Sequence, residues 1–209
     1  MRFLMQNLHH TKPELFEYVG GGTTQLTNGG YPMSKGAVSF EKDNEYYTPK
    51  GIVKYFGKFD YDPATTIEKA KEFGVENYDT IETNGLNTDW TKYNRIWINP
   101  PFSDKHLFVE KAYETYKKNP KLDIYILFPI EFLTTGRFHK ITSGRGGKLF
   151  IPNGRIKFES GLGKKSTSCA FGSIILKVQD KWEVEMVDMS NFDEDKQISI
   201  FDIKEEIKW

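Results

Sequence analysis

Residues 95–102 have the sequence Arg-Ile-Trp-Ile-Asn-Pro-Pro-Phe, a short apolar strand that ends in asparagine, two prolines and an aromatic residue. The Asn99 side-chain oxygen and the Pro100 carbonyl are two acceptors at the end of this strand. Consecutive prolines fix φ and remove backbone donors, so we expect this carbonyl to face a ligand rather than a neighbouring strand. Phe102 supplies a flat face on which a base can stack, a contact worth roughly 1–3 kcal/mol.

This arrangement suits methyl transfer to the amino group of a planar base. The amino nitrogen of adenine is a poor nucleophile because its lone pair is delocalised into the ring. Two acceptors that take both of its N–H bonds favour a pyramidal nitrogen and make that lone pair available. A sulfonium donor leaves as a neutral thioether, so no acid is needed. The alternative is that the two prolines only end a buried strand, and the motif alone leaves both interpretations open.

Length and composition exclude several classes of protein. The chain has 209 residues, enough for one well-buried domain with a modest appendage. Its one cysteine, Cys169, excludes an internal disulfide and is typical of a reducing cytosol, and the four histidines show no metal-ligand spacing with it. No apolar run approaches the roughly 20 residues that span a bilayer, and the N-terminus lacks a signal-peptide pattern. We therefore expect a soluble cytoplasmic protein without a metal.

Charge is balanced overall, with 29 basic and 29 acidic residues, but it is unevenly distributed. Residues 137–165 contain eight lysines and arginines against one acid, whereas residues 181–209 contain nine acids against four lysines. A basic segment with glycine-rich turns is a candidate contact for the phosphates of double-stranded DNA, and a solvated loop is the alternative. The candidate DNA-binding residues are Arg155, Lys157, Lys164 and Lys165.

Three regions of the chain differ in pattern. Residues 1–43 contain two glycine-rich stretches and no period of two or 3.6, which indicates a flexible arm or a lid. Residues 44–190 alternate strands and helices and then become strand-rich, which predicts an α/β domain whose mixed sheet ends in antiparallel strands. Residues 191–209 form an acidic tail. The predicted helices lie at 48–56, 66–73 and 104–118, and the predicted strands at 58–62, 77–81, 95–99, 122–129, 148–151, 155–159, 168–178 and 182–189.

Local signals set the ends of these elements. Thr48 is expected to cap the first helix, with Pro49 in its first turn, and Gly74 is expected to end the second. Residues 122–129 are apolar at almost every position, as in a strand that is buried on both sides. The third helix has apolar residues spaced to share one buried face: Leu107, Phe108, Ala112 and Tyr116.

Six segments occur in a fixed order along the chain. They are Tyr47-Thr48-Pro49, Phe59-Asp60-Tyr61-Asp62-Pro63-Ala64, Gly85-Leu86 with Trp90, Trp97-Ile98-Asn99-Pro100-Pro101-Phe102, Phe128-Pro129, and Asn153-Gly154-Arg155-Ile156-Lys157-Phe158. This order resembles the bacteriophage DNA N-6-adenine methyltransferase family over residues 45–178. The resemblance implies a Rossmann-like S-adenosylmethionine-dependent methyltransferase fold and an enzyme that methylates the N-6 amino group of adenine at specific sites in double-stranded DNA.

The resemblance also implies roles for particular residues. Asn99, Pro100, Pro101 and Phe102 match the family's catalytic loop, and the implied contacts to S-adenosylmethionine are Tyr47, Thr48, Pro49, Asp62, Pro63, Ala64, Gly85 and Leu86. Independently, Asp62 and Asn99 each follow a strand of an open α/β sheet, where ligands bind beyond the carboxyl ends. Asp62 is suited to pair with the donor's ammonium group and the turn after Thr48 to hold its carboxylate. A helix cap is the alternative role for Asp62.

The chain departs from the family pattern at three points. No glycine-rich loop follows Asp62, so cofactor binding is supported less directly than catalysis. Asn84 stands where the family has an aspartate, and Asp79 and Glu82 are candidate substitutes for binding the ribose hydroxyls of the donor. Phe108 stands where the family has a tryptophan, and we interpret it as a core residue.

Two classes of function follow from these observations. In the first, the protein is an enzyme that flips the target adenine out of the duplex, at a cost of about a few kcal/mol, before methyl transfer. In the second, it is a non-catalytic phage DNA-binding or interaction protein that has kept the fold and lost the cofactor, and the missing glycine loop supports this alternative. Enzymes that methylate glutamine side chains or RNA adenine also carry the motif. The glutamine enzymes resemble this chain only there and usually have that loop, and enzymes that methylate the amino group of cytosine favour serine at position 99.

The acidic tail contains a short motif of its own. Residues 197–201 are similar to the peptide by which proteins dock on the bacterial sliding clamp, and such a peptide folds on its partner. The alternative is a last strand that packs on the domain, because a five-residue match arises easily by chance. The predicted docking residues are Gln197, Ile198, Ser199, Ile200 and Phe201.

Overall fold

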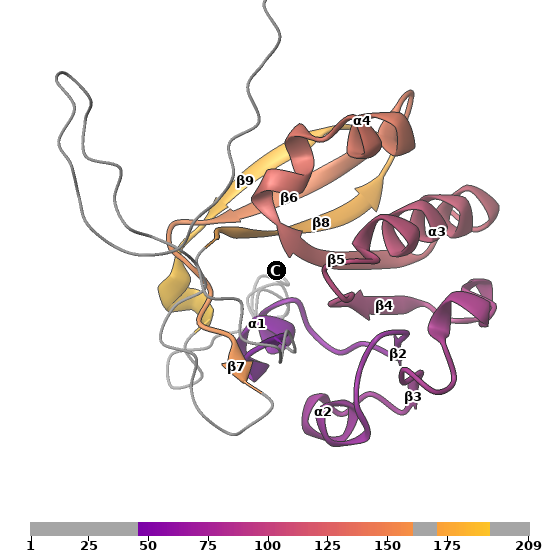
Figure 1. Ribbon diagram of the computed structural model, residues 1–209, viewed down its shortest axis with the longest axis vertical. Helices are drawn as coiled ribbons and strands as arrows, with labels where there is room; N and C mark the ends of the chain where they lie inside the picture. The colour runs from indigo at the N-terminus through magenta and orange to yellow at the C-terminus, as the bar shows by residue number, and fades with distance from the viewer. Residues whose placement is uncertain (1–45, 161–170, 193–209) are drawn as a thin grey trace, which may run out of the picture. The chain divides into compact units, whose positions relative to one another are not determined.

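The structure, a computed structural model, describes residues 46–160 and 171–192. Its main element is a seven-stranded sheet with the strand order β3-β2-β4-β5-β8-β6-β9 (Figure 1). β8 is antiparallel to both of its neighbours, and all other neighbouring pairs in this sheet are parallel. The predicted mixed α/β sheet is confirmed, with one reversed strand. The strands are β2 (Tyr61–Asp62), β3 (Asn77–Tyr78), β4 (Arg95–Ile98), β5 (Asp123–Pro129), β6 (Gly146–Pro152), β8 (Ser173–Gln179) and β9 (Glu183–Val187).

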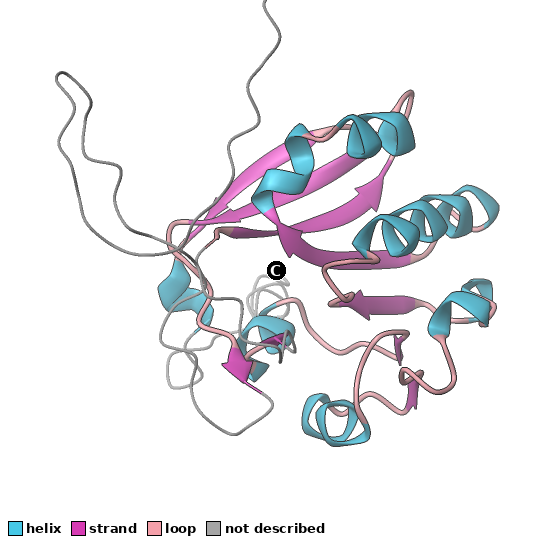
Figure 2. Ribbon diagram, viewed as in Figure 1, coloured by secondary structure: helices cyan, strands magenta, loops and turns pink. Residues whose placement is uncertain are grey.

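Helices cover both faces of this sheet (Figure 2). α3 (Lys105–Lys118) and α4 (Gly136–Thr142) pack on one face, and α1 (Lys50–Tyr55) packs on the other, while α2 (Ile67–Phe73) joins β2 to β3. No helix in the described part of the chain is long and apolar enough to cross a membrane. The described residues also form four short 3-10 helices: η1 (Gly85–Asn87), η2 (Trp90–Lys92), η3 (Ile130–Thr134) and η4 (Met189–Phe192).

A second, two-stranded sheet stands apart from the main one in its hydrogen bonding. It pairs β1 (Tyr46–Tyr47) with β7 (Glu159–Ser160) in antiparallel fashion, with Tyr46 opposite Ser160 and Tyr47 opposite Glu159. We call this pair the β1–β7 ribbon. The sequence predicted a strand at 155–159, but only Glu159 of that range is in a strand. Ile156 and Phe158 alternate with exposed neighbours because they are buried against α1, not because they belong to a ladder.

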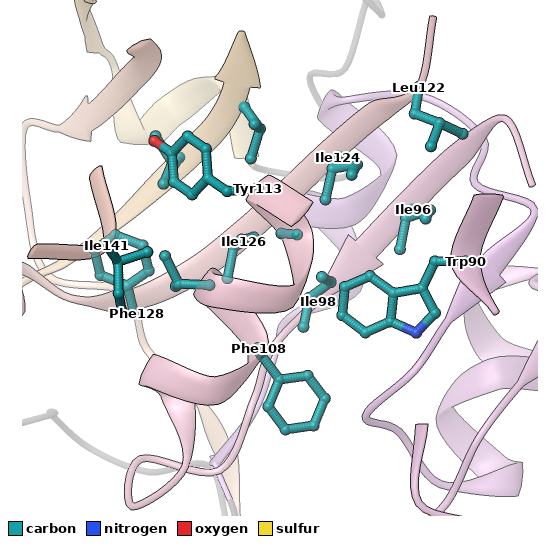
Figure 3. Close-up of a cluster of buried hydrophobic side chains, with 14 of the residues drawn as sticks. Trp90, Ile96, Ile98, Phe108, Tyr113, Leu122, Ile124, Ile126, Phe128 and Ile141 are labelled. Carbon is teal, nitrogen blue, oxygen red and sulfur yellow. The ribbon is translucent and has the colours of Figure 1, made fainter. Parts of the chain in front are cut away.

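β5 runs through the centre of the sheet and is buried on both faces. Ile124, Ile126 and Phe128 belong to the cluster covered by α3 and α4, part of which Figure 3 shows. Tyr125 and Leu127 belong to the cluster on the opposite face, next to α1. Full burial of such a side chain stabilises the fold by about 1.5–3 kcal/mol, so an apolar run of this length fits an interior strand. The prediction of a strand that is buried on both sides is confirmed.

The buried face of α3 is rotated from the predicted one. Phe108 and Ala112 are buried as expected, but Leu107 is 40% exposed. The helix buries Val109 and Tyr113 instead. These four buried positions form a stripe at the i, i+1, i+4, i+5 spacing of one helix face, and Leu107 lies at its margin.

The first helix begins later than predicted, and the second ends as predicted. Pro49 is extended, with φ −60° and ψ 138°, and occupies the cap position of α1, so the expected cap by Thr48 is wrong. Thr48 is one residue too far from the helix for its side chain to bond the first turn. At α2, Thr66 caps the start through its hydroxyl, and Gly74 ends the helix in the left-handed region with φ 69°, which glycine adopts without strain.

Two other predictions need correction. The strand predicted at 58–62 shortens to β2, because the Asp60 carboxylate accepts the backbone N–H groups of Asn94 and Arg95 at 2.9 and 2.8 Å. The sequence analysis also missed α4, which lies in the segment read as basic and glycine-rich. Thr135 caps this helix and Phe138 is buried beneath it. A helix of seven residues leaves too few turns for its period to stand out.

The parallel strands place two polar side chains at one edge of the sheet. β2 and β4 are adjacent and parallel, with Tyr61 opposite Ile96. Asp62 is the last residue of β2, and Asn99 directly follows β4. Both residues therefore lie at the carboxyl ends of neighbouring strands, where open α/β sheets bind their ligands.

Candidate active site

A cavity of about 920 Å³ lies at this edge of the sheet. Its wall combines β1, the segment from the end of β2 into α2, residues 80–82 and 84–86, Trp97, and residues 99–104 with the start of α3. Of the predicted cofactor-binding and catalytic residues, Pro49 lies outside this wall. The cavity brings together the others: Tyr47, Thr48, Asp62, Pro63, Ala64, Gly85, Leu86, Asn99, Pro100, Pro101 and Phe102.

The side chain of Asn99 is held in one orientation. Its Nδ2 donates a hydrogen bond of 2.7 Å to the carbonyl oxygen of Tyr46. Because a carbonyl can only accept, this contact identifies the nitrogen side of the amide, and Oδ1 lies on the other side. Within the described residues, neither Asn99 Oδ1 nor the Pro100 carbonyl accepts a hydrogen bond, whereas the Pro101 carbonyl accepts one from Asp104 at 3.0 Å. Two adjacent acceptors thus remain at the end of β4.

Aromatic rings surround Phe102. The ring of Tyr46 stacks on it at a centroid distance of 5.3 Å and an angle of 27°, and Phe171 meets it edge-on at 5.0 Å. Lys105 fixes the backbone of the same loop by donating from Nζ to the Phe102 carbonyl at 2.5 Å. A flat base that enters this part of the cavity therefore meets preorganised aromatic surface, which favours stacking.

Asp62 is a buried carboxylate, 2% exposed, in the cavity wall. It accepts a hydrogen bond of 3.0 Å from the backbone N–H of Ala64. No salt bridge to it occurs in residues 46–160 and 171–192. Burial raises the pKa of Asp62 to about 7, against the opposing hydrogen bonds from Ala64 and Thr65. A carboxylate of this kind is suited to a ligand that brings its own positive charge.

Two further polar atoms of the cavity wall are buried without a partner among the described residues, Thr48 Oγ1 and Trp97 Nε1. Leaving a buried donor unpaired costs roughly 1–3 kcal/mol, so both atoms favour a ligand that accepts hydrogen bonds. The sequence analysis assigned no binding role to Trp97. The signal that could have found it is the period of an extended chain, in which side chains two positions apart, such as those of residues 97 and 99, point to the same side.

Gly85 allows two segments of the wall to approach closely. A Cβ at this position would lie 2.2 Å from the Pro63 carbonyl oxygen, so any other residue would push the segments apart. Trp90 donates from Nε1 to the Gly85 carbonyl at 2.8 Å, and Lys111 donates to the Leu86 carbonyl at 2.5 Å. Asn84 has a positive φ of 54° and accepts from the Leu86 N–H at 3.2 Å. Asparagine tolerates that conformation, as aspartate does, so the backbone does not explain the replacement of the family's acid.

The two acids considered for the ribose differ in location. Asp79 accepts hydrogen bonds from the hydroxyls of Tyr61 and Thr88 at 2.5 and 2.7 Å and does not line the cavity. Glu82 does line it, is exposed, and accepts from the Thr80 hydroxyl. Only Glu82 of the pair is placed to meet a ligand.

The predicted DNA contacts are placed only in part. Arg155 and Lys157 are exposed in the segment between β6 and β7, outside the cavity wall. Lys164, Lys165 and the docking peptide Gln197–Phe201 lie outside the described residues, so they stay predictions. No group of three or more histidine, cysteine, aspartate or glutamate side chains in the described residues is arranged to hold a metal ion.

An open α/β sheet with one reversed strand, and a cavity beyond the carboxyl ends of β2 and β4, define the Rossmann-like methyltransferase class of fold. The sequence model of the family described as DNA N-6-adenine-methyltransferase (Dam) matches residues 39–200, and the chain belongs to this family. It is 29% identical over 157 residues to the DNA N-6-adenine-methyltransferase of Escherichia phage T1. That match covers 66% of this chain and 64% of the phage protein, so the chain spans less than two thirds of its relative.

Among solved structures, the chain is similar to a class I S-adenosylmethionine-dependent methyltransferase from Listeria monocytogenes. The identity is 18% and the TM-score is 0.35, and the match covers 60% of this chain and 45% of that chain.

The pKa of Asp62 leads to a prediction about stability. The folded state holds this proton more tightly than the unfolded state, where the pKa is about 3.9. The contribution of Asp62 to stability is therefore complete below about pH 4 and is lost as the pH rises through about 7. We expect Asp62→Asn to raise the unfolding temperature of the ligand-free protein by several degrees at pH 8, and by much less at pH 4. Thermal unfolding at both values measures this difference. Asp104→Asn, which removes an exposed carboxylate of the same cavity, is the control and should show no such trend.

Proposed function

We propose that this protein is a DNA methyltransferase that transfers a methyl group from S-adenosylmethionine to the N-6 amino group of adenine at specific sites. Membership of the Dam family supports this activity. The observation that carries the proposal is the fixed amide of Asn99, whose nitrogen is bonded to Tyr46 so that its oxygen is left to accept from a substrate. The Asn99 oxygen can accept a hydrogen bond from a substrate amino group, whereas a loop with a purely structural role would not need this acceptor.

The target amino group is bound by the end of β4. Asn99 Oδ1 and the Pro100 carbonyl each accept one N–H of the adenine, which favours a pyramidal nitrogen with an available lone pair. Phe102 and its aromatic neighbours stack on the base, a contact worth roughly 1–3 kcal/mol. This offsets part of the cost of about a few kcal/mol for flipping adenine out of the duplex. Catalysis then consists mainly of positioning.

The wall residues fit the methyl donor group by group. Asp62 pairs with its ammonium group, the unpartnered Thr48 hydroxyl and Trp97 indole N–H donate to its carboxylate, and Glu82 accepts from its ribose hydroxyls. When bound, the donor supplies a methyl group on a sulfonium, which leaves as a neutral thioether. The support for the first two contacts is that, among the described residues, Asp62 is buried without an ion-pair partner and Thr48 Oγ1 and Trp97 Nε1 are buried without a hydrogen-bond partner, which is costly without a ligand. The support for Glu82 is its place in the cavity wall.

The duplex is proposed to contact the basic segment that precedes β7. Arg155 and Lys157 are exposed there, two to four residues from β7. Lysine and arginine side chains at such positions neutralise phosphates and release counterions. Lys164 and Lys165 continue the same basic segment in the sequence.

The first experiment measures transfer of labelled methyl groups to plasmid DNA, followed by sequencing of the modified sites. We expect the unsubstituted protein to label adenine, and Asn99→Ala to lower kcat by about a hundredfold or more, because it removes one acceptor for the amino group. Donor affinity, measured by calorimetry, should change little. Asn87→Ala, an exposed asparagine outside the cavity wall, is the matched control. Full activity of Asn99→Ala would remove the basis of the proposal.

The second experiment follows donor affinity with pH. Asp62 must be ionised to pair with an ammonium group, and its pKa of about 7 leaves it mostly protonated at pH 6. We therefore expect donor affinity to increase by about five- to sixfold between pH 6 and pH 7.5, because the ionisation of Asp62 outweighs the partial loss of the proton from the donor's amino group. Calorimetric titration measures this slope. Asp62→Asn should bind weakly and without the slope, and Asp104→Asn should keep it. A flat profile for the unsubstituted protein would contradict the pairing.

A further inference from the structure

The β1–β7 ribbon carries the group that orients Asn99, yet it is a very small sheet. Each of its strands has two residues, and in the described part of the chain it forms a sheet separate from the seven-stranded one. Two-stranded sheets are at best marginally stable by themselves. The Tyr46 carbonyl must nevertheless stay within hydrogen-bond distance of Asn99 for the amide to keep its orientation. An additional contact must therefore hold the ribbon in place.

Lys69 of α2 makes such a contact. Its Nζ lies 2.5 Å from Oε2 of Glu159, which is in the ribbon, and 2.7 Å from Oε2 of Glu72, which is in its own helix. The same ammonium lies 5.8 Å from the centre of the Tyr47 ring. Tyr47 and Glu159 are directly opposite each other in the ribbon. One lysine thus contacts both strands of the ribbon at a single cross-strand pair.

The environment of Lys69 favours a persistent contact. Its side chain is 11% exposed, whereas that of Glu159 is 43% exposed, so the ion pair is shielded from water on the lysine side only. Burial works to lower the pKa of the Lys69 ammonium, but Glu159 and Glu72 outweigh this effect and the pKa is raised above its ordinary value. Lys69 therefore carries its charge throughout the neutral range.

The Lys69–Glu159 ion pair connects the part of the site near Asp62 with the part near Asn99. Lys69 lines the cavity and belongs to the helix that starts directly after the Asp62 segment. Lys69 contacts the Tyr47–Glu159 pair, and Tyr46 is the residue next to Tyr47 in β1. Tyr46 accepts from Asn99 through its carbonyl and stacks on Phe102 through its ring.

We propose that Lys69 and Glu159 are positioning residues, whose ion pair holds the β1–β7 ribbon so that Tyr46 keeps Asn99 oriented for methyl transfer. This inference rests on the proposed function. Neither side chain touches the reacting atoms, so their effect is on kcat through the geometry of Asn99. A purely stabilising ion pair would instead lower the unfolding temperature and leave kcat of the folded protein unchanged.

The two carboxylates on Lys69 provide a matched pair of variants. Glu159→Gln removes the contact to the ribbon, whereas Glu72→Gln removes a contact within α2 and leaves the ribbon contact in place. We expect Glu159→Gln to lower kcat by about tenfold or more, since small displacements of positioning groups cost rates of this order. Its KM for the donor and its unfolding temperature should stay near those of the unsubstituted protein. Glu72→Gln should retain kcat.

A charge exchange tests whether the pair itself is required. The double variant Lys69→Glu with Glu159→Lys restores an attraction between α2 and the ribbon, and kcat should recover relative to Lys69→Glu alone. Unchanged kcat in Glu159→Gln would overturn the proposal. It would equally be overturned if kcat and the unfolding temperature fell together in both Glu159→Gln and Glu72→Gln, because that result describes general stabilisation.

Hydrogen–deuterium exchange separates this inference from the proposed activity. In the absence of DNA and donor, the backbone amides of residues 46–48 and 158–160 should exchange faster in Glu159→Gln than in Glu72→Gln, while those of β5 stay protected in both. Failure of the unsubstituted protein to methylate DNA would refute the proposed function. The exchange rates would still test whether the Lys69–Glu159 ion pair holds the ribbon in place. Equal protection of the ribbon in both variants would overturn its positioning role.

Discussion

The hydrogen bond from Asn99 Nδ2 to the Tyr46 carbonyl is the interaction on which the site depends. It joins residues 53 positions apart in the sequence, one after a central strand and one in a two-residue strand. β4 supplies a rigid base for Asn99, because it lies between β2 and β5 in the middle of the sheet. The ribbon supplies only a carbonyl, but that carbonyl decides which atom of the amide is available to a substrate. The chemistry of the motif is thus completed by a partner outside it.

The cavity keeps several polar groups in a state that costs stability. Asp62 is buried without a cation among the described residues, and Thr48 Oγ1 and Trp97 Nε1 are buried without partners. In an ordinary core such groups are paired or replaced by apolar ones. Here they occur together in one wall, at the edge where the fold class binds ligands. Their common location supports the proposal that this wall binds a ligand.

The sequence predicted those parts of the fold that depend on neighbouring residues. The apolar run of β5, the strand before Asn99 and the glycine that ends α2 each follow from a local pattern, and all three are present. The β1–β7 ribbon and the Lys69–Glu159 contact join residues about 90 or more positions apart in the sequence. No pattern among neighbouring residues predicts such contacts. The error at Thr48 has a local origin instead: the extended Pro49 takes the cap position, so the helix starts one residue later and Thr48 lines the cavity.

The absence of a glycine-rich loop after Asp62 weighs less against cofactor binding than the sequence alone suggests. Glycines in such loops let backbone and ligand approach closely. In this structure Gly85 packs against the Pro63 carbonyl from a different segment, so the close approach is made between two segments of the wall rather than within one loop. The non-catalytic alternative draws its support from the missing loop. It offers no reason why, among the described residues, a buried carboxylate lacks an ion-pair partner and two buried donors lack hydrogen-bond partners. The methyl donor that we propose, with its ammonium and carboxylate groups, would account for all three.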